Sequence, residues 1–377
     1  MKLPVSAISE VDAKPALGPS IWAVSDGRAG NDGQVRAIAS ALRETGRWMR
    51  IAHIPGAGHK SGPVHLTARA PFRWFSKIGS VDPQRALSKT DQELIGAPYP
   101  TVWVGAGART APFSAQVRKL SGGATLSVHV LDPRTTNTDF DILVTPRHDL
   151  SEGNNVVRTI GSPAYFSADD VEEAGLAFAD LADEQGRSAI VVLGGDSRTH
   201  TFDKAAMRRL EVHLRAVIAQ GWRLRITCSR RTPVPARAFF RTFADQVGAR
   251  FWEGSSDGPN PYLAWLLFSD AAIVTEDSTN MLSDAAYFGL PIHMARLTGR
   301  SDKFDRLHDS LIGKGIARWL HGGLETWSYE PLREADKVAD RIVEVLLERF
   351  PQPDLQGGGG VVSVSYTHLT LPTTPYV

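Results

Sequence analysis

The chain has 377 residues, of which 42% are hydrophobic and 22% are charged, and its net charge is +1. This length allows two or three domains with full cores, and a near-neutral charge gives no reason to expect nucleic acid as a partner. The single cysteine, Cys228, excludes an internal disulfide framework and a cysteine metal cluster. Residues 1–19 lack the apolar core of a signal peptide, and no run is long enough to cross a bilayer. We therefore expect a cytoplasmic protein with a disordered leader at 1–19.

The first half of the chain alternates short apolar runs with helical patterns, which is typical of a parallel α/β domain. We predict strands at 21–24, 49–54, 101–105, 126–131, 140–144 and 156–160. The first strand runs into SDGRAGNDGQ, a glycine-rich turn that suits close approach of a ligand to the backbone. This turn is neither a P-loop nor a G-x-G-x-x-G fingerprint.

The third strand ends in GAGART, which has only part of a dinucleotide-binding fingerprint. Gly105 and Gly107 are present, but Arg109 and Thr110 follow where the pattern needs another glycine. An NAD-dependent oxidoreductase is therefore the least favoured function for this chain.

Aromatic and basic residues alternate in the segment 71–79, PFRWFSKIG. Phe72, Trp74 and Phe75 beside cations suit peripheral contact with headgroups on the inner face of a membrane. Packing of this segment onto its own domain explains the same pattern at least as well.

The α/β pattern restarts after Ser162–Pro163 and the acidic stretch 169–187, so we place a domain boundary there. Further strands are expected at 189–193, 224–228, 250–252, 271–274 and 292–295. An i, i+3, i+4 apolar stripe predicts an amphipathic helix near the end of the chain. We thus predict domains at 20–165 and 186–332, followed by a helix at 333–350.

The stretch 271–291 reads as a buried strand, a polar turn and a helix that stops at Gly289 and Pro291. In such units a ligand lies beyond the strand, beside the helix N-terminus. Asp277 and Asp284 share one helix face by their spacing, and paired carboxylate oxygens suit the hydroxyls of a ribose. Helix capping and a solvated carboxylate are the structural alternative.

Other strand ends of the second half carry residues that suit a nucleotide diphosphate. Gly194–Gly195 allows close backbone approach, Arg230 and Arg231 can neutralise phosphates, and Asn260 and Tyr262 can contact a base. Each has a plain structural explanation alone, but together they fall at successive strand ends of one domain. The predicted nucleotide-binding residues, for which the resemblance described below implies a nucleotide-sugar, are Gly194, Gly195, Asp196, Ser197, Ser229, Arg230, Arg231, Thr232, Asn260, Tyr262, Thr275, Asp277, Ser278, Met281, Ser283 and Asp284.

The tail from about Gly357 differs in character from the rest of the chain. VSYTHLTLPTT resembles a translated sequencing-library adapter, so we interpret residues 357–377 as an artefact and leave them out of fold reasoning.

Several motifs taken together resemble the mitochondrial-fission ELM-like family, which is itself similar to GT-B glycosyltransferases. They are SDGRAGNDGQ, GAGARTAP, LDPR, FDILVTPRHD, GGDSRTHTFD, SRRTP, NPY and TEDSTNMLSDAAYFGLPI. The resemblance implies two Rossmann-like domains facing a cleft, nucleotide-sugar binding by the second, no metal requirement, and a terminal helix that crosses back to the first. Two positions depart from the pattern: Asp284 stands where many GT-B enzymes have Glu, and Asn31 where relatives often have His.

An inverting sugar transfer needs a base in the first domain that accepts a proton from the acceptor hydroxyl. The candidates at strand ends are Asp26, His148 and Asp149, with a slight preference for His148 because its ordinary pKa suits base work near neutrality. Acceptor-side loops are expected to contribute Gly27, Arg28, Gly30, Gln34, Gly107, Arg109 and Thr110.

The leading hypothesis is a metal-independent glycosyltransferase that acts on a lipid-linked or cell-envelope saccharide, with a nucleotide-sugar as co-substrate and no other cofactor. The competing hypothesis is a non-catalytic, membrane-associated scaffold that keeps the fold and recruits a partner. Because one fold supports many functions, the fold cannot decide between them.

Overall fold

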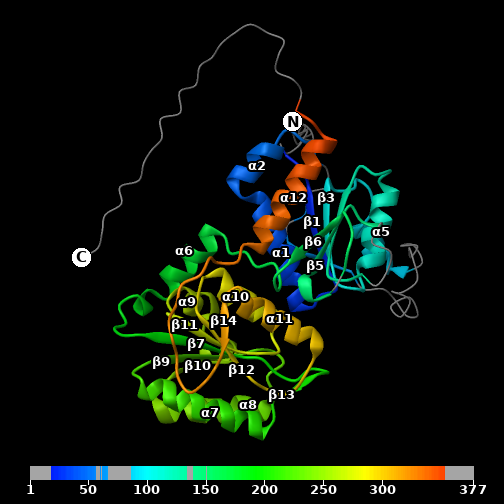
Figure 1. The fold of residues 1–377 in the computed structure, drawn as a ribbon. Helices are drawn as coiled ribbons and strands as arrows, with labels where there is room; N and C mark the ends of the chain where they lie inside the picture. Colours follow the sequence, from blue (N-terminus) through cyan, green and yellow to red (C-terminus); the bar gives the residue numbers. More distant parts are fainter. Residues whose placement is uncertain are drawn as a thin grey trace, which may run out of the picture.

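A computed structural model of the chain describes residues 18–56, 60, 62–66, 86–133, 139–149 and 151–352. They form two α/β domains, each built on a six-stranded sheet (Figure 1). The aromatic segment with Phe72, Trp74 and Phe75, residues 1–17 of the expected leader, and the tail from Gly357 lie outside the described residues.

The first sheet is parallel throughout, in the strand order β2-β1-β3-β4-β5-β6. Buried runs of Val, Ile, Leu and Trp form its central strands, as expected for a sheet covered on both faces. Its strands are β1 Ile21–Ser25, β2 Val64–His65, β3 Val102–Ala106, β4 Leu126–Val130, β5 Ile142–Pro146 and β6 Val156–Thr159.

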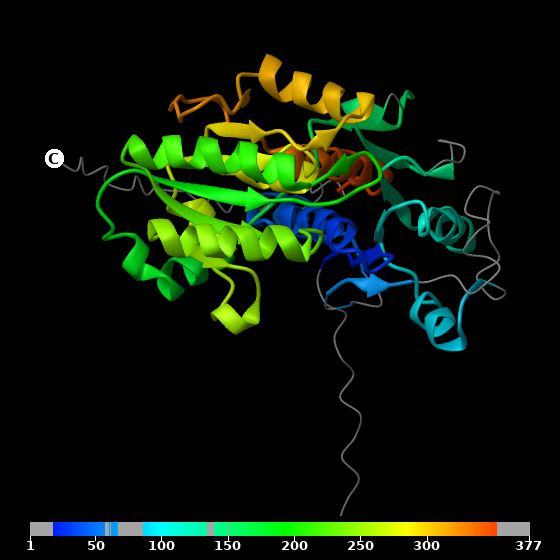
Figure 2. The same ribbon diagram turned by 90° about the horizontal axis from the view of Figure 1, so that it is seen from below.

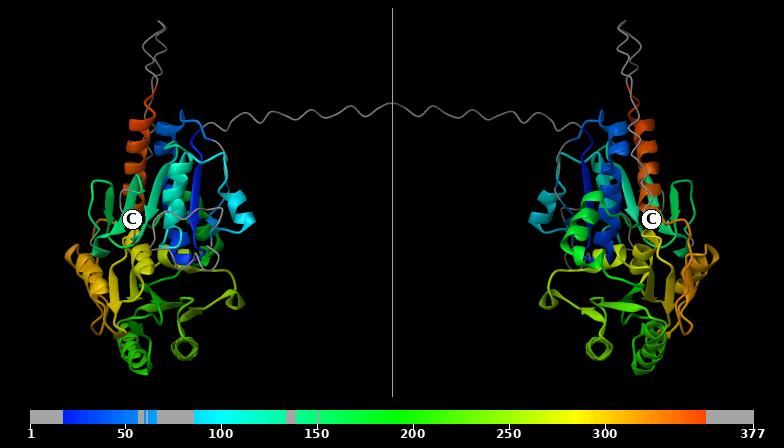
Figure 3. Two further views of the ribbon diagram at one scale, coloured as in Figure 1. Left: turned by 90° about the vertical axis from the view of Figure 1, so that its right-hand side faces the viewer. Right: turned by 90° about the vertical axis from the view of Figure 1, so that its left-hand side faces the viewer.

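Helices cover both faces of the first sheet. α1 (Ala29–Arg43) and α12 (Glu334–Arg349) pack on one face, in a core that also includes Ile51 and Ile54. α5 (Ala111–Leu120) and the region around α4 (Lys89–Leu94) cover the other face, where Trp22 and Trp103 meet. α12 comes last in the chain but belongs to the first core, as the side views in Figure 3 show.

The strand predicted at 49–54 is wrong, because these residues belong mostly to α2 (Thr45–Ile51) and the turn after it. The carboxylate of Glu44 accepts hydrogen bonds from the backbone N–H groups of Gly46 and Arg47 at 3.2 and 3.3 Å, which stabilises the start of this helix. The edge strand of the sheet comes later, as β2.

The second sheet is also parallel, with the order β10-β9-β7-β11-β12-β14. This is the order of a doubly wound nucleotide-binding sheet. Strands β9 and β10 are added on one side of β7, and the later strands β11, β12 and β14 are added on the other, so the strand order reverses between β7 and β11. Its strands are β7 Ser188–Leu193, β9 Arg223–Cys228, β10 Arg250–Trp252, β11 Ala271–Thr275, β12 Ile292–Ala295 and β14 Ala317–Trp319.

α7 (Lys204–Ala219) and α8 (Val234–Val247) lie side by side on one face of the second sheet (Figure 2). The other face packs against α9 Tyr262–Leu267, α10 Thr279–Tyr287 and α11 Asp302–Gly313. α6 (Ala168–Ala177) precedes this domain and contacts α9.

Three strands of the second domain are not among the predicted ones. The strand at 292–295 is not the last, because β14 pairs with it at the sheet edge. β8 (His200–Thr201) and β13 (Thr298–Gly299) form a small antiparallel pair that the apolar pattern does not reveal. Each of these strands has only two or three residues, too few for a periodic signal.

The chain crosses between the domains twice, and both crossings contact Tyr287 at the end of α10. In the first crossing, the backbone carbonyl of Phe166 accepts a hydrogen bond from the Tyr287 hydroxyl at 3.2 Å. In the second, the Arg333 guanidinium lies 4.1 Å from the centre of the Tyr287 ring. None of the described helices is long and apolar enough to cross a membrane.

Ile342→Ala in α12 should lower the free energy of unfolding by about 2–5 kcal/mol, because a fully buried side chain is lost from the first core. Denaturant unfolding checks this, with the exposed Glu348→Ala on the same helix as the control. Equal and small effects of both substitutions would contradict the placement of α12 in that core.

Candidate functional site

A buried carboxylate joins the strand ends at the reversal point of the second sheet. Asp277 follows β11, and its Oδ2 accepts from the backbone N–H of Gly195 at 3.0 Å, while its Oδ1 accepts from Thr275 Oγ1 at 2.7 Å. Arg231, from the loop after β9, lies 2.7 Å from Asp277 Oδ2. Thr275 in turn accepts from the N–H of Gly194 at 2.7 Å.

This arrangement changes the interpretation of the glycine pair Gly194–Gly195. A Cβ on Gly194 would overlap the Asp277 carboxylate, and one on Gly195 would overlap the backbone carbonyl of Arg231. Both positions therefore need glycine for contacts inside the protein. Sequence analysis attributed the same freedom to approach by a ligand.

Most other predicted polar residues around β7 and β9 hold the loops in shape. The hydroxyl of Thr232 donates to the Gly194 carbonyl at 2.6 Å, and Asp196 accepts from the N–H of Phe202 at 2.8 Å. Ser197 and Ser229 accept in the same way from the N–H groups of His200 and Arg231. Arg230 differs: its exposed side chain has no partner among the described residues.

The N-terminus of α10 lacks a side-chain cap. Ser278 occupies the cap position, but its side chain accepts no hydrogen bond from the helix. Asp277, which the sequence offered as a cap, turns inward to Arg231 instead. The first N–H groups of a helix carry partial positive charge, so this end suits an anion.

Asp284 and Tyr262, both predicted to bind the nucleotide, contact each other. The Tyr262 hydroxyl donates to Asp284 Oδ2 at 2.9 Å. Burial raises the pKa of Asp284 to about 7, and the hydrogen bond from Tyr262 acts in the opposite direction. Asn260 is exposed and accepts from the backbone N–H of Tyr262 at 3.0 Å.

Two further predicted residues lie on α10. Met281 packs against the core beneath the helix. Ser283 accepts a hydrogen bond from the backbone N–H of Ser162 at 2.9 Å and donates to the Thr279 carbonyl. Ser283 therefore ties α10 to the first interdomain crossing.

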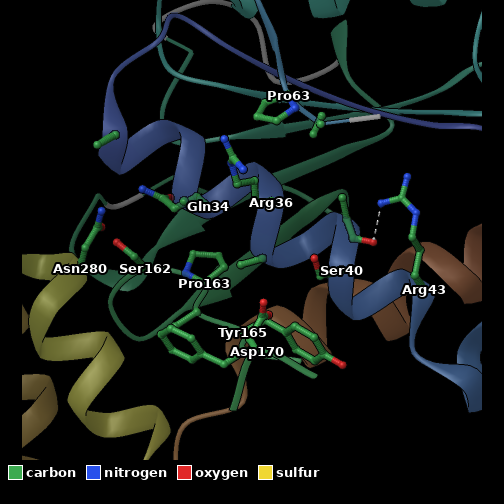
Figure 4. A pocket seen from close by; sticks show the side chains of 18 of the residues that line it. Gln34, Arg36, Ser40, Arg43, Pro63, Ser162, Pro163, Tyr165, Asp170 and Asn280 are labelled. Carbon is green, nitrogen blue, oxygen red and sulfur yellow. Dashed lines mark hydrogen bonds between the residues drawn. The ribbon is translucent and has the colours of Figure 1, made fainter. Parts of the chain in front are cut away.

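A cavity of about 520 Å³ lies between the two domains. One wall is α1, another is the crossing segment from Ser162 to Phe166, and Asn280 and Asp284 of α10 line one end. Figure 4 shows Gln34 of α1 beside Asn280 and Ser162. The uncapped end of α10 thus borders a space large enough for a small ligand.

The glycine-rich turn after β1 is held by its own polar residues. Asp26 is almost fully buried, accepts from Asn31 Nδ2 at 2.8 Å and pairs with Arg28 at 3.4 Å. Gly27 and Gly107 have φ angles of 76° and 91°, a region that favours glycine.

The remaining acceptor-side residues have different environments. Thr110 is buried and donates to the Ala106 carbonyl at 2.7 Å, whereas Arg109 is exposed. Gly30 lies so close to Asn280 that a Cβ would contact its amide nitrogen at 2.9 Å. This approach joins the start of α1 to the start of α10.

His148 and Asp149 form a contact between the domains. Arg306 of α11 donates to the His148 carbonyl at 3.0 Å, and Lys303 lies 2.5 Å from Asp149 Oδ1. The side chain of His148 is 5% exposed. Burial lowers the pKa of His148 to about 4, with smaller effects of the same sign from Lys303 and Arg306, while Asp149 opposes them.

Sequence analysis missed a histidine–carboxylate pair in the first domain. His65 ends β2, and its Nε2 lies 3.1 Å from Asp32 Oδ2 of α1. The other Asp32 oxygen accepts from the Ser25 hydroxyl, and the His65 side chain is 52% exposed. A two-residue strand gives no apolar pattern, and the two partners are 33 positions apart, so nothing in the sequence pointed to this pair.

Glu276 and His308 were also missed, and both are buried. Glu276 accepts from the backbone N–H of Leu297 at 2.7 Å, and His308 Nε2 lies 2.8 Å from the Glu276 carbonyl oxygen. Burial raises the pKa of Glu276 and lowers that of His308. Within the described ranges, no three His, Cys, Asp or Glu side chains are grouped so as to hold a metal ion.

Residues 29–346 match the model of a family described as Mitochondrial fission ELM1. The chain belongs to this family. The resemblance drawn from the sequence motifs is therefore confirmed.

Two curated relatives resemble the chain. The mitochondrial fission protein ELM1 of Arabidopsis thaliana is 26% identical over 278 residues, which cover 66% of this chain and 65% of the plant protein. An uncharacterised protein of Rickettsia prowazekii is 24% identical over 368 residues, covering 86% of this chain and 97% of its own. This chain thus spans about two thirds of the plant member of the family and nearly all of the bacterial one.

Among solved structures, UDP-GlcNAc 2-epimerase from Methanocaldococcus jannaschii has the same fold. The TM-score is 0.53 at 12% identity, and the match covers 87% of this chain and 99% of the epimerase. The two Rossmann-like domains of the GT-B-like fold, with the terminal helix returned to the first domain, are as the sequence predicted.

Asp284→Asn should change how stability depends on pH. Because the pKa of Asp284 is raised to about 7 in the folded chain, its contribution to stability is full below the ordinary pKa near 4 and falls as the pH rises to 7. The unfolding free energy of the wild type minus that of Asp284→Asn should therefore decrease from pH 4 to pH 7 and stay constant above pH 7. Denaturant unfolding at four pH values measures it, and a pH-independent difference would contradict the raised pKa.

Proposed function

We propose that the chain binds a nucleoside diphosphate sugar in the interdomain cavity and transfers the sugar to an acceptor hydroxyl. The observation that carries this proposal is the uncapped N-terminus of α10, which opens on a cavity lined by both domains. Its N–H groups would bind the diphosphate, and the exposed Arg230 would add a charge-assisted contact. Asp284 would accept a hydrogen bond from the ribose through Oδ1, since Tyr262 contacts Oδ2.

In this proposal His65 acts as the general base in place of Asp26, His148 and Asp149. Asp26 is tied to Asn31 and Arg28, and Asp149 pairs with Lys303 of the other domain. The His148 side chain is 5% exposed, and burial lowers its pKa. His65 is half-exposed at a strand end and oriented by Asp32, the relation that general-base histidines have to a carboxylate. It would accept the proton of the acceptor hydroxyl, whose oxygen bonds to the anomeric carbon while the bond from that carbon to the diphosphate breaks.

The pairing of Asp26 and Asp149 and the burial of His148 also support a second candidate. A chain that binds nucleotide-sugar without transferring it could serve as a recruitment protein, in keeping with the name of its plant relative. A membrane-bound or envelope acceptor, independence from metal ions and contact with a membrane surface remain predictions under both candidates.

UDP and other nucleoside diphosphates should raise the melting temperature of the chain, because a ligand that binds only the folded state stabilises it. Asn280→Asp should abolish the shift, since it adds a negative charge where the phosphates would lie. Asn154→Asp makes the same change at an exposed position outside the cavity and should keep the shift. The proposal fails if no diphosphate in a panel shifts the wild type.

His65→Gln should lower the release of nucleoside diphosphate from a nucleotide-sugar by about 10²–10⁴-fold while the melting shift persists. Asp32→Asn should have a smaller effect of the same kind, and His321→Gln, an exposed histidine of the second domain, should have none. A wild type that binds the nucleotide-sugar but releases no diphosphate would favour the non-catalytic candidate.

A further inference from the structure

The cavity carries positive charge along the first domain. Arg36, Arg43 and Lys60 line it from this side. The carboxylates among its described lining residues belong to Asp170 and Asp284. Asp170 accepts from the backbone N–H and the hydroxyl of Ser167 at 3.0 and 2.6 Å, and Asp284 is bonded to Tyr262. Both carboxylates are therefore engaged by other residues.

Arg36 and Arg43, which line the cavity, differ from the nearby Arg47 in having no carboxylate partner among the described residues. Arg47 contacts Asp336 at 2.8 Å and Asp340 at 2.7 Å. Arg43 donates only to the carbonyls of Ala39 and Ile21, and Arg36 has no partner among the described residues. Arg43 is exposed as a whole residue but lines the cavity, and desolvation lowers its pKa, so an anion there would stabilise its charge.

The cavity is long. One face of α1 presents the small residues Ala29, Gly33, Ala37 and Ser40 to it. Figure 4 shows the lining from Asn280 past Gln34, Arg36 and Ser40 to Arg43. Gly30 contacts Asn280 and Arg43 ends the helix, so at 1.5 Å per residue the two ends are about 20 Å apart.

Gln34 gives an independent indication of a ligand. Its side chain lines the cavity, the residue is 5% exposed, and its Oε1 has no hydrogen-bond partner among the described residues. Its Nε2 donates to the Gly30 carbonyl at 3.2 Å, which fixes the amide orientation. Buried polar atoms nearly always have partners, so this oxygen suits a hydroxyl or N–H of a bound molecule.

We propose that Arg36, Arg43 and Lys60 bind a phosphate or carboxylate group of an elongated acceptor. The two arginines stand about 9 and about 20 Å along α1 from the contact of Gly30 with Asn280, so the group lies between these positions and away from the N-terminus of α10. This inference deepens the proposed function and rests on it for the word acceptor. The donor sugar lies at the α10 end, Gln34 contacts the middle of the bound pair, and the arginines hold the far anionic group through charge-assisted bonds. A lipid headgroup and a free saccharide phosphate offer the same anionic oxygens.

Calorimetric titration of the full chain, in the presence of UDP, tests the anion site with trehalose 6-phosphate and neutral trehalose. Sedimentation with phosphatidylcholine vesicles, with and without phosphatidylglycerol, tests the lipid source. Arg36→Glu should lower the affinity for whichever anionic probe binds the wild type by at least about tenfold, because a charged hydrogen bond is replaced by repulsion. Arg50→Glu, an exposed position on α2 with the same charge change, should leave binding unchanged.

The proposal is overturned if neither anionic probe binds better than its neutral counterpart, or if Arg36→Glu and Arg50→Glu weaken binding equally. Arg43→Gln gives a second variant, checked for folding by its melting temperature. If UDP does not raise the melting temperature of the wild type but trehalose 6-phosphate still binds in a way that depends on Arg36, the proposed transferase is rejected and the anion site is kept. If UDP raises the melting temperature but no anion binding depends on Arg36, the anion site is rejected and the nucleotide site is kept.

Discussion

The carboxylate of Asp277 is the contact on which the second domain's site depends. It is fully buried and shared among the ends of three adjacent strands, with Arg231 as its counter-ion. The Arg231 side chain is 43% exposed, so solvent screens the ion pair and it adds little net stability. Its effect in this domain is geometric: it determines where β11 ends, and so where the uncapped α10 begins.

Five strands of the second domain and the strand–turn–helix after Ala271 follow from apolar runs and stop signals in the sequence, whereas the order of the strands in the sheet does not. The partners of the polar residues do not. Gly194 and Asp277 both appeared to face a ligand, because spacing places residues at a strand end without showing which side chain turns inward. His65 and Asp32 come together only through the pairing of β1 with β2, a contact between distant segments.

The cavity combines parts that differ in their origin. Its α10 end depends on the doubly wound sheet, which belongs to many unrelated nucleotide-binding proteins. Its other end depends on the face of α1 with Gly33, Arg36 and Ala37, in the first domain. A ligand that fills the cavity would therefore contact both domains.

The two crossings that meet at Tyr287 limit how the domains can move. A rotation of one domain against the other would keep both crossings intact only if its axis passed near that residue. The contacts of Arg306 with His148 and of Lys303 with Asp149 lie on a different helix, α11, and resist this rotation. These contacts join the domains at a second place beside the crossings, and because the Lys303 side chain is half-exposed, ionic strength weakens its pair with Asp149.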